Sequence, residues 1–406
     1  MHMPSRVVTF YHSDLGTFHV PQGHRFKPYR AHLARSLLDA LGVRVETVVP
    51  PLASKADLGQ FHADVLLNVL EVTDHMLESQ SEPQIQAQLS RLNLSTDASS
   101  SCPIFPGMFF FCRMYVTGSV GGAYILNAKA ASTVINWFGG AARAKKAWAS
   151  DGCLVNDAVL AVLELLKAHE RVLYVSMDFA HPTGVEEAFY TTSRVLSLSF
   201  HREMQFGPGL EDDDGFARGK GYTVNVPLGQ GVDDALYVPL FTNVVRAAAA
   251  AYQPDAVVFV ASPAVLAGDR HGDFALSSEG HAACVRVVHE LGLPLLVLGG
   301  LSSNAVHAAR VWATATAILS DAGPLDAARV PADHPCALFI EGADALAVPT
   351  CTVPRDADLP ANVAALEQRT LARLAALRAD AAAPAAAAPL AASAAPVASA
   401  DLLKLT

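Results

Sequence analysis

The sequence lacks an uninterrupted apolar run of about 18 residues, the length that a membrane-spanning helix requires, because glycines, prolines and charges break every hydrophobic stretch. It has only six cysteines, none in closely spaced pairs, and its start has no apolar segment typical of a secretory signal. We therefore expect a soluble protein with reduced thiols that does not span a membrane. A formal net charge of −10 argues against extensive contact with nucleic-acid phosphates, so we expect no direct nucleic-acid binding.

Hydrophobic residues make up 51% of the 406 residues, enough to bury a large core. Short apolar runs alternate with amphipathic segments, the pattern of a parallel sheet with helices on both faces. The expected buried strands are Val7–Tyr11, Val172–Phe179, Val195–Phe200, Ala256–Ala261 and Leu295–Leu298. The expected helices are Val155–Glu170, with Asn156 and Asp157 near its start, Ser277–Leu291, closed by Gly292, and Asn362–Arg378.

The end of the sequence has a different composition, since residues 381–400 are almost entirely alanine, proline and serine. Spaced prolines interrupt helix there, and no large apolar stripe is present to dock. We expect a folded domain over residues 1–378 and a flexible tail over residues 379–406. Leu402, Leu403 and Leu405 are better explained as frayed terminal residues than as a docking motif.

Several collinear motifs resemble those of class I histone deacetylases. They are GHRFKPYR at Gly23–Arg30, SCPIFPG at Ser101–Gly107, NWFGGAARAKK at Asn136–Lys146, the segment 171–201 and GGLSSNAV at Gly299–Val306. The resemblance implies the arginase/deacetylase fold: an α/β protein with a single large domain, built on an eight-stranded parallel sheet flanked by helices.

The resemblance also implies where the family's metal would bind. Its chemistry needs a divalent ion held by two carboxylates and a histidine, with open coordination positions. The three ligand positions correspond to Asp178, Ala180 and Ala264, and only Asp178 can coordinate a metal. We therefore expect no zinc at this site.

Other chemical groups of the family are replaced as well. Its two consecutive histidines correspond to Ala142 and Arg143, and its oxyanion-binding tyrosine corresponds to Ser303. Arginine stays protonated and cannot act as a general base. The carboxylates that orient the two histidines correspond to Ser176 and Thr183, so the changes are mutually consistent.

The substrate-binding walls implied by the resemblance are also altered. The paired phenylalanines of the acyl-lysine tunnel correspond to Gly152 and Gly207, and the rim aspartate corresponds to Pro106. A local misalignment could restore one or two of these positions but not all of them.

A buried carboxylate that has lost a metal needs another positive charge or a proton. We expect an ion pair between Arg143 and Asp178, with a solvent-facing Arg143 as the alternative. Histidines 181, 201 and 281 are expected to make ordinary hydrogen bonds.

The resemblance further implies two other kinds of ligand. Potassium could bind at the outer site, which corresponds to Phe189, Thr192, Val195 and Tyr222; an inner site, at Asp178, Ser199 and Phe200, is weakened by Ser176. Inositol phosphate could bind Lys27 and Arg270, although another arginine of that pocket corresponds to Val306, and a solvated basic helix is the alternative.

Three functions follow from these observations. The favoured one is a histone deacetylase homologue without catalytic activity, hence not an enzyme, that acts as a scaffold or regulatory subunit of a chromatin complex. Its expected partners are protein subunits such as an active deacetylase or a corepressor-like protein, and its expected location is the nucleus, with the cytoplasm as the alternative. The second function is deacetylation of histone acetyl-lysine or a small acetylated amine by a rebuilt site, and the third is a reader of acylated ligands.

Overall fold

The computed structural model describes residues 6–21, 27–78, 82–204, 208–270, 273–323, 325, 329–339, 346–348, 350 and 353–381. Within these ranges the chain forms one α/β domain built on an eight-stranded sheet. Every pair of neighbouring strands in that sheet is parallel.

The order of strands across the sheet is β2-β1-β3-β10-β8-β4-β5-β6. In that order their bounds are Glu46–Val48, Val7–Phe10, Thr133–Asn136, Leu295–Leu298, Ala256–Ala261, Val172–Met177, Val195–Arg202 and Thr223–Leu228. A separate two-stranded ladder joins β7 (Val232–Asp233) and β9 (Phe274–Ala275).

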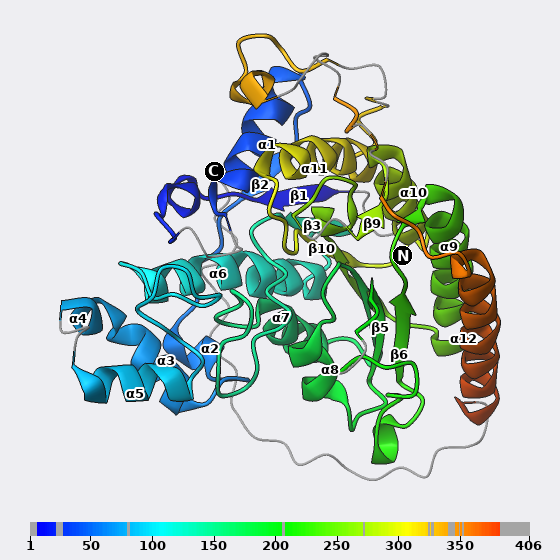
Figure 1. Ribbon diagram of the computed structural model, residues 1–406, viewed down its shortest axis with the longest axis horizontal. Coiled ribbons are helices and arrows are strands. Elements are labelled where there is room, and N and C mark those ends of the chain that lie inside the picture. Colours follow the sequence, from blue (N-terminus) through cyan, green and yellow to red (C-terminus); the bar gives the residue numbers. More distant parts are fainter. Residues whose placement is uncertain are drawn as a thin grey trace.

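Helices cover both faces of this sheet (Figure 1). On one face α6 contacts α7 and α7 contacts α8. On the other face the helices contact one another in the order α1, α11, α10, α9 and α12. The bounds are α1 Tyr29–Ala40, α6 Met108–Asn127, α7 Asp157–Leu165, α8 Thr183–Phe189, α9 Asp234–Tyr252, α10 Ser278–His289, α11 Ala305–Leu319 and α12 Leu359–Ala381. The short helices α2 Lys55–Leu58, α3 Asp64–Glu71, α4 Thr73–Glu78 and α5 Pro83–Arg91 form a lobe beside α6.

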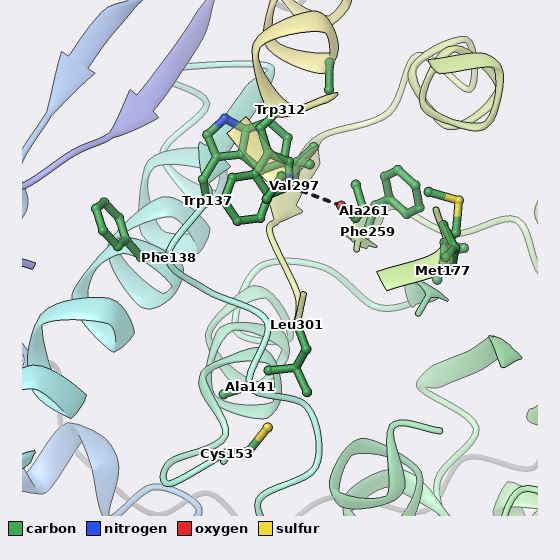
Figure 2. Packing of buried hydrophobic residues seen from close by; sticks show 14 of the residues in the cluster. Trp137, Phe138, Ala141, Cys153, Met177, Phe259, Ala261, Val297, Leu301 and Trp312 are labelled. Atoms are coloured by element: carbon green, nitrogen blue, oxygen red, sulfur yellow. Dashed lines mark hydrogen bonds between the residues drawn. The ribbon is translucent and has the colours of Figure 1, made fainter. Parts of the chain in front are cut away.

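The core has two layers because alternate side chains of each strand point to opposite faces of the sheet. On β8, Val257 and Phe259 belong to one buried cluster, whereas Val258 and Val260 belong to the other. Within the larger cluster the rings of Trp137 and Trp312 stack with centroids 5.4 Å apart, and the Trp312 indole N–H donates to the Ala261 carbonyl at 3.4 Å (Figure 2). This packing fixes the ends of β3 and β8 against α11.

The structure confirms the expected fold and the five expected strands, with differences at strand ends. Strand β4 stops at Met177, two residues before the expected end, and β5 continues to Arg202 because it stays paired with β6 as far as Leu228. Strands β2 and β3 were not expected, since three or four residues are too few to show a clear pattern.

The expected helices are present, but two of them are shorter. The side chain of Asn156 caps α7 by accepting from the Val159 N–H, and Ser277 caps α10 through the Glu279 and Gly280 N–H groups. Helix α7 ends at Leu165 because the Arg194 guanidinium, a long-range partner, donates to the carbonyls of Leu166 and His169. Helix α12 begins at Leu359, before the expected start.

Five of the six cysteines lie in the described ranges, and all five are buried free thiols; Cys351 lies outside those ranges. The expected tail and its leucines also lie almost entirely outside the described residues, which end at Ala381. Across the described part of the chain, no helix is long and apolar enough to cross a membrane.

Candidate functional site

The polar centre lies where three adjacent strands of the sheet end. Asp178 follows β4, Ser262 follows β8, and Gly299–Leu301 follows β10. In an open parallel sheet the carboxyl ends of the strands lie at one edge, which is where ligands bind. The sheet therefore brings these three loops together although they are far apart in the sequence.

Asp178 is only 6% exposed, and backbone groups satisfy its carboxylate. The N–H of Ala180 donates to Oδ1 at 3.2 Å, and the N–H of Leu301 donates to Oδ2 at 3.3 Å. Burial raises the pKa of Asp178 to about 6, and the hydrogen bonds from the Ala180 and Leu301 N–H groups oppose that rise. The Ser262 hydroxyl also donates to the Leu301 carbonyl at 2.5 Å.

A glycine allows the loop after β10 to approach Asp178 this closely. Gly300 has a φ of +69°, which disfavours other residues, and a Cβ there would lie 2.7 Å from the Ser262 Cβ and 3.0 Å from the Asp178 Oδ2. The buried Arg30 supports the loop, since its Nη2 donates to the Gly300 carbonyl at 3.2 Å.

The residues at the expected metal positions do not fit a zinc ion. Ala180 and Ala264 offer only methyl groups, and both carboxylate oxygens of Asp178 already accept backbone N–H groups. Among the described residues, no group of three or more His, Cys, Asp or Glu side chains is arranged to hold a metal. Zinc in proteins requires at least three such ligands.

The expected ion pair between Arg143 and Asp178 is not formed. Arg143 instead pairs through Nη1 with the carboxylate of Asp151. Its charge still reaches Asp178, where it is the smallest of the influences that lower the pKa of that carboxyl. Asp151 could not be predicted as the partner of Arg143, because the two are close only through a turn in the chain.

That turn has a defined geometry. Ser150 and Cys153 exchange two backbone hydrogen bonds of 2.9 and 2.8 Å, and the two residues between them have positive φ angles, +49° at Asp151 and +81° at Gly152. Positive φ at both central positions is the requirement of a type I′ turn, and Asp-Gly is among the sequences that favour it. The glycine expected in place of a tunnel phenylalanine therefore shapes this turn.

Leu301 fills the space beside the centre with an apolar side chain. It is 7% exposed and belongs to the same buried cluster as Ala141 and Cys153. Figure 2 shows its side chain directed toward these two residues. Leu301 was not among the predicted site residues, although an apolar residue in a Gly-Gly-Leu-Ser-Ser loop indicates a buried position.

Ser303, at the expected tyrosine position, lies in a different network. Its hydroxyl donates to Asp269 Oδ1 at 2.9 Å and accepts from the Arg270 N–H at 2.8 Å. Asp269 is 5% exposed. Its Oδ2 accepts from the Ser302 hydroxyl and from the Ser303 N–H, at 3.0 Å each. Ser303 therefore holds the loop closed around Asp269.

Ala142 lies in a segment that a buried aspartate organises. Asp157 accepts from the N–H groups of Gly140 and Ala141 at 2.9 and 2.8 Å and from the Ser119 hydroxyl at 2.5 Å. Burial raises its pKa, and these donors oppose the rise. Asp157 was predicted only to lie near the start of a helix, and its bonds to Gly140 and Ala141 were not predicted.

The remaining expected site positions differ in burial. Ser176 and Thr183 are both buried, on β4 and at the start of α8, whereas Pro106 is exposed. Gly207 lies outside the described residues.

Histidines 181 and 201 make the ordinary hydrogen bonds that were expected. His201 Nε2–H donates to the Gly209 carbonyl and its Nδ1 accepts from Ser199, both at 2.9 Å, and His181 Nε2 lies 3.0 Å from the Glu186 carboxylate. Burial lowers the pKa of His201 to about 3, so its ring is neutral. His281 Nε2 likewise lies 3.3 Å from the Ala261 carbonyl.

The residues expected at the outer potassium site lie at the amino ends of β5 and β6. The Phe189 carbonyl accepts from the Thr192 N–H at 3.1 Å, and the Tyr222 carbonyl accepts from the Ser197 N–H at 2.9 Å. Val195 begins β5. The first contact closes the turn after α8, and the second joins β5 to the residue that precedes β6.

Lys27 and Arg270, expected to bind inositol phosphate, are close enough to influence each other. Burial lowers the pKa of Lys27, and the charges of Arg270 and Arg30 lower it further. Val306, at the position of the missing arginine, is the second residue of α11. The structure thus gathers cations at this point of the surface.

Fold and site together define an α/β protein of the arginase/deacetylase class. A family model described as the histone deacetylase domain matches residues 24–319, and the chain belongs to this family. It is 43% identical over 317 residues to histone deacetylase 6 of Arabidopsis thaliana, covering 77% of this chain and 66% of the relative. It is 43% identical over 317 residues to histone deacetylase 1 of Oryza sativa subsp. japonica (77% and 60%) and 39% identical over 320 residues to histone deacetylase 1 of Homo sapiens (78% and 65%).

These comparisons correct one prediction. The chain was expected not to be an enzyme, but relatives at 39–43% identity are named histone deacetylases, which are enzymes, and nothing in the described structure shows that the chain is inactive. The replacement of individual side chains was therefore too narrow a basis for that prediction. The matched region spans 60–66% of the length of these relatives.

Proposed function

We propose that this chain is a regulatory or scaffold subunit of a chromatin deacetylase complex. The observation that supports the proposal is the centre at Asp178. Backbone N–H groups donate to both of its carboxylate oxygens, while residues 24–319 still match the histone deacetylase domain. A framework that is kept around a remodelled centre can still present the family's outer surface to other proteins. The partners are protein subunits, and the place of action is the nucleus.

Co-purification tests this proposal directly. The tagged full chain is expected to isolate a histone deacetylase or a corepressor-like protein in a stoichiometric complex. Digestion of nucleic acid with a nuclease should leave that complex intact, since the chain carries a net charge of −10. Isolation of the chain alone, as a monomer or with its own copies, contradicts the proposal.

We also propose that positions 178, 180 and 264 hold no zinc ion, although the family is zinc-dependent. The support is the donor set, in which only Asp178 has a metal-binding side chain. Elemental analysis of the purified protein is expected to show zinc far below one ion per chain. The variant with Ala180→His and Ala264→Asp supplies the missing donors and serves as the control that should gain zinc; stoichiometric zinc in the wild type contradicts the proposal.

A second candidate function is hydrolysis of histone acetyl-lysine or a small acetylated amine by a rebuilt centre. The names of the relatives favour it, and so does the retention of a buried carboxylate at the end of β4. In such a centre, Ala180 and Leu301 hold Asp178 in place, and Leu301 excludes water beside it. Turnover of acetylated peptides that Asp178→Asn abolishes and Asp212→Asn preserves supports this function, because the Asp212 side chain is exposed.

Two ligands complete the proposal. Potassium at Phe189, Thr192, Val195 and Tyr222 ties α8 to the sheet, and a polyanion such as inositol phosphate binds at Lys27 and Arg270. Potassium is expected to raise the melting temperature more than sodium does. Inositol phosphate is expected to bind the wild type and to lose affinity in Lys27→Gln and Arg270→Gln; equal affinity in these variants contradicts the second site.

A further inference from the structure

A surface pocket lies at the amino end of the sheet, whereas Asp178 lies at the carboxyl end. Its volume is about 350 Å³, and the last turns of α10 and α11 line it. Both helices end there because a helix that connects parallel strands returns to the end where the next strand begins. Ala317 and the partly buried Ile318 give the pocket apolar walls. It is large enough to receive side chains of a peptide.

The charges around this pocket favour a cation beside an apolar group. The Asp321 side chain is 81% exposed, and among the described residues its one ion pair is a loose contact, 4.0 Å from His289 Nε2. Arg286 and Glu290 also line the pocket, and each has a closer partner, at 2.7 and 2.9 Å. The end of α11 adds partial negative charge, and its last turn has no basic residue. A lysine flanked by apolar residues therefore fits, with its amine at Asp321 and its neighbours against Ile318.

The chain itself has a segment with this chemistry. Residues 401–406 have the sequence DLLKLT, in which leucines flank Lys404 on both sides. They lie outside the described residues. Lys404 is the only basic residue after Arg378, and residues 382–400 have no charged side chain. Leu402–Leu405 is therefore the one part of this tail that offers both a cation and adjacent large apolar side chains.

The path of α12 brings this segment within reach of the pocket. Its first residue, Leu359, lies beside Gly229, just after β6, and Leu377 lies beside Gly221, just before β6. Helix α12 thus ends at the same end of the sheet as the pocket. It packs on α9, α9 on α10 and α10 on α11. With helix axes about 10 Å apart, the distance to span is roughly 25 Å, and residues 382–401 can extend over about 60 Å.

We propose that Leu402–Leu405 docks within its own chain in the pocket between α10 and α11. Lys404 pairs with Asp321, and the flanking leucines contact Ile318 and Ala317. The docked segment closes the pocket and holds the end of the tail at the amino end of the sheet, away from Asp178. The inference depends neither on catalytic activity nor on a partner subunit.

Zero-length cross-linking of the full chain tests the inference. A carbodiimide joins a lysine amine to a carboxylate, with loss of water, only where the two groups meet. The wild type is expected to form an amide between Lys404 and Asp321 within one chain, identified by mass spectrometry. No cross-link from Lys404, or cross-links spread without preference over other exposed carboxylates, overturns the inference. A link between two chains, detected by mixing isotope-labelled and unlabelled protein, assigns the pocket to a second copy and overturns it as well.

Variants of the tail separate docking from accidental encounter. Leu403→Ser combined with Leu405→Ser should lower the yield of the Lys404–Asp321 link about tenfold, because the apolar contacts are lost while both reacting groups remain. Leu390→Ser is the matched control, a leucine of the same tail outside the docking segment. These substitutions lie outside the described domain, so misfolding of the domain cannot produce the loss. An unchanged yield in the double variant overturns the inference.

Discussion

The guanidinium of Arg143 and the carboxylate of Asp151 form an ion pair across a type I′ turn, eight residues apart in the chain. Arg143 stands at the position of one of the family's consecutive histidines. Its pairing with Asp151 leaves Asp178 to the backbone N–H groups of Ala180 and Leu301. Arg143 and Asp178 were expected to pair with each other. Instead, Asp151 neutralises Arg143, and backbone N–H groups bind Asp178.

The turn that carries Asp151 depends on Gly152. With a φ of +81°, any residue with a Cβ is strained there, so Gly152→Ala should lower the free energy of unfolding by about 1 kcal/mol. Urea denaturation measures the change. Gly59→Ala is the control, because Gly59 has a helical φ of −66° and a Cβ there meets nothing closer than 3.4 Å. Equal effects of the two substitutions would contradict the account of the turn.

Leu301 should stabilise the protein by filling space beside the centre. Leu301→Ala is expected to lower the free energy of unfolding by about 2–4 kcal/mol, because buried leucine-to-alanine changes leave a cavity. Leu338→Ala should have little effect, since Leu338 is 82% exposed. A change at Leu301 of less than about 1 kcal/mol in chemical denaturation would mean that its side chain does not fill a close-packed space.

His62 should make the protein sensitive to acid. Its Nε2 accepts from the Asn156 N–H at 2.9 Å, and burial lowers its pKa to about 4. The unfolded chain, with a histidine pKa of about 6.5, therefore binds the proton first, and stability falls as the pH drops from about 6.5 to about 4. Thermal unfolding across this range measures the slope. His62→Gln should flatten the slope, whereas His75→Gln should preserve it, because the His75 side chain is 84% exposed.

Asp157 should be essential for the segment that carries Arg143. Asp157→Asn turns one acceptor oxygen into an amide donor facing the N–H groups of Gly140 and Ala141, so we expect a loss of about 2 kcal/mol in unfolding free energy. Hydrogen exchange should also speed up at Gly140 and Ala141. An Asp157→Asn variant as stable as the exposed-site variant Asp212→Asn would show that these bonds contribute little.

Periodicity and local capping signals predicted much of this fold. Asn156 and Ser277 cap helices as their positions indicated, and the buried apolar runs became strands. The end of α7 could not be predicted, because Arg194, a residue from another part of the chain, provides its carbonyl partner. Short strands such as β2 were missed because pairing with a neighbour, and not their own composition, makes them strands.

The contacts around Asp178 could not be predicted from the sequence. The resemblance located Asp178 and the positions around it, and these lie together at the strand ends. The partner of Arg143 depends on the backbone conformation of Asp151, and the packing of Leu301 depends on a loop that Gly300 allows to approach Asp178. Neither feature follows from residue types alone. The same limit applies to activity, where the replacement of the family's side chains predicted that the chain is not an enzyme, a prediction that the comparisons contradict.

The five buried thiols can report local opening of the protein. Burial raises the pKa of Cys112 and Cys153 to about 12, so at neutral pH these sulfurs are neither accessible nor ionised. An alkylating reagent can modify them only during moments when the surrounding layer separates. Since Cys112 lies on α6, Cys284 on α10, and Cys153 beside Arg143, the order of labelling in mass spectrometry would reveal which layer loosens first, without any engineered probe.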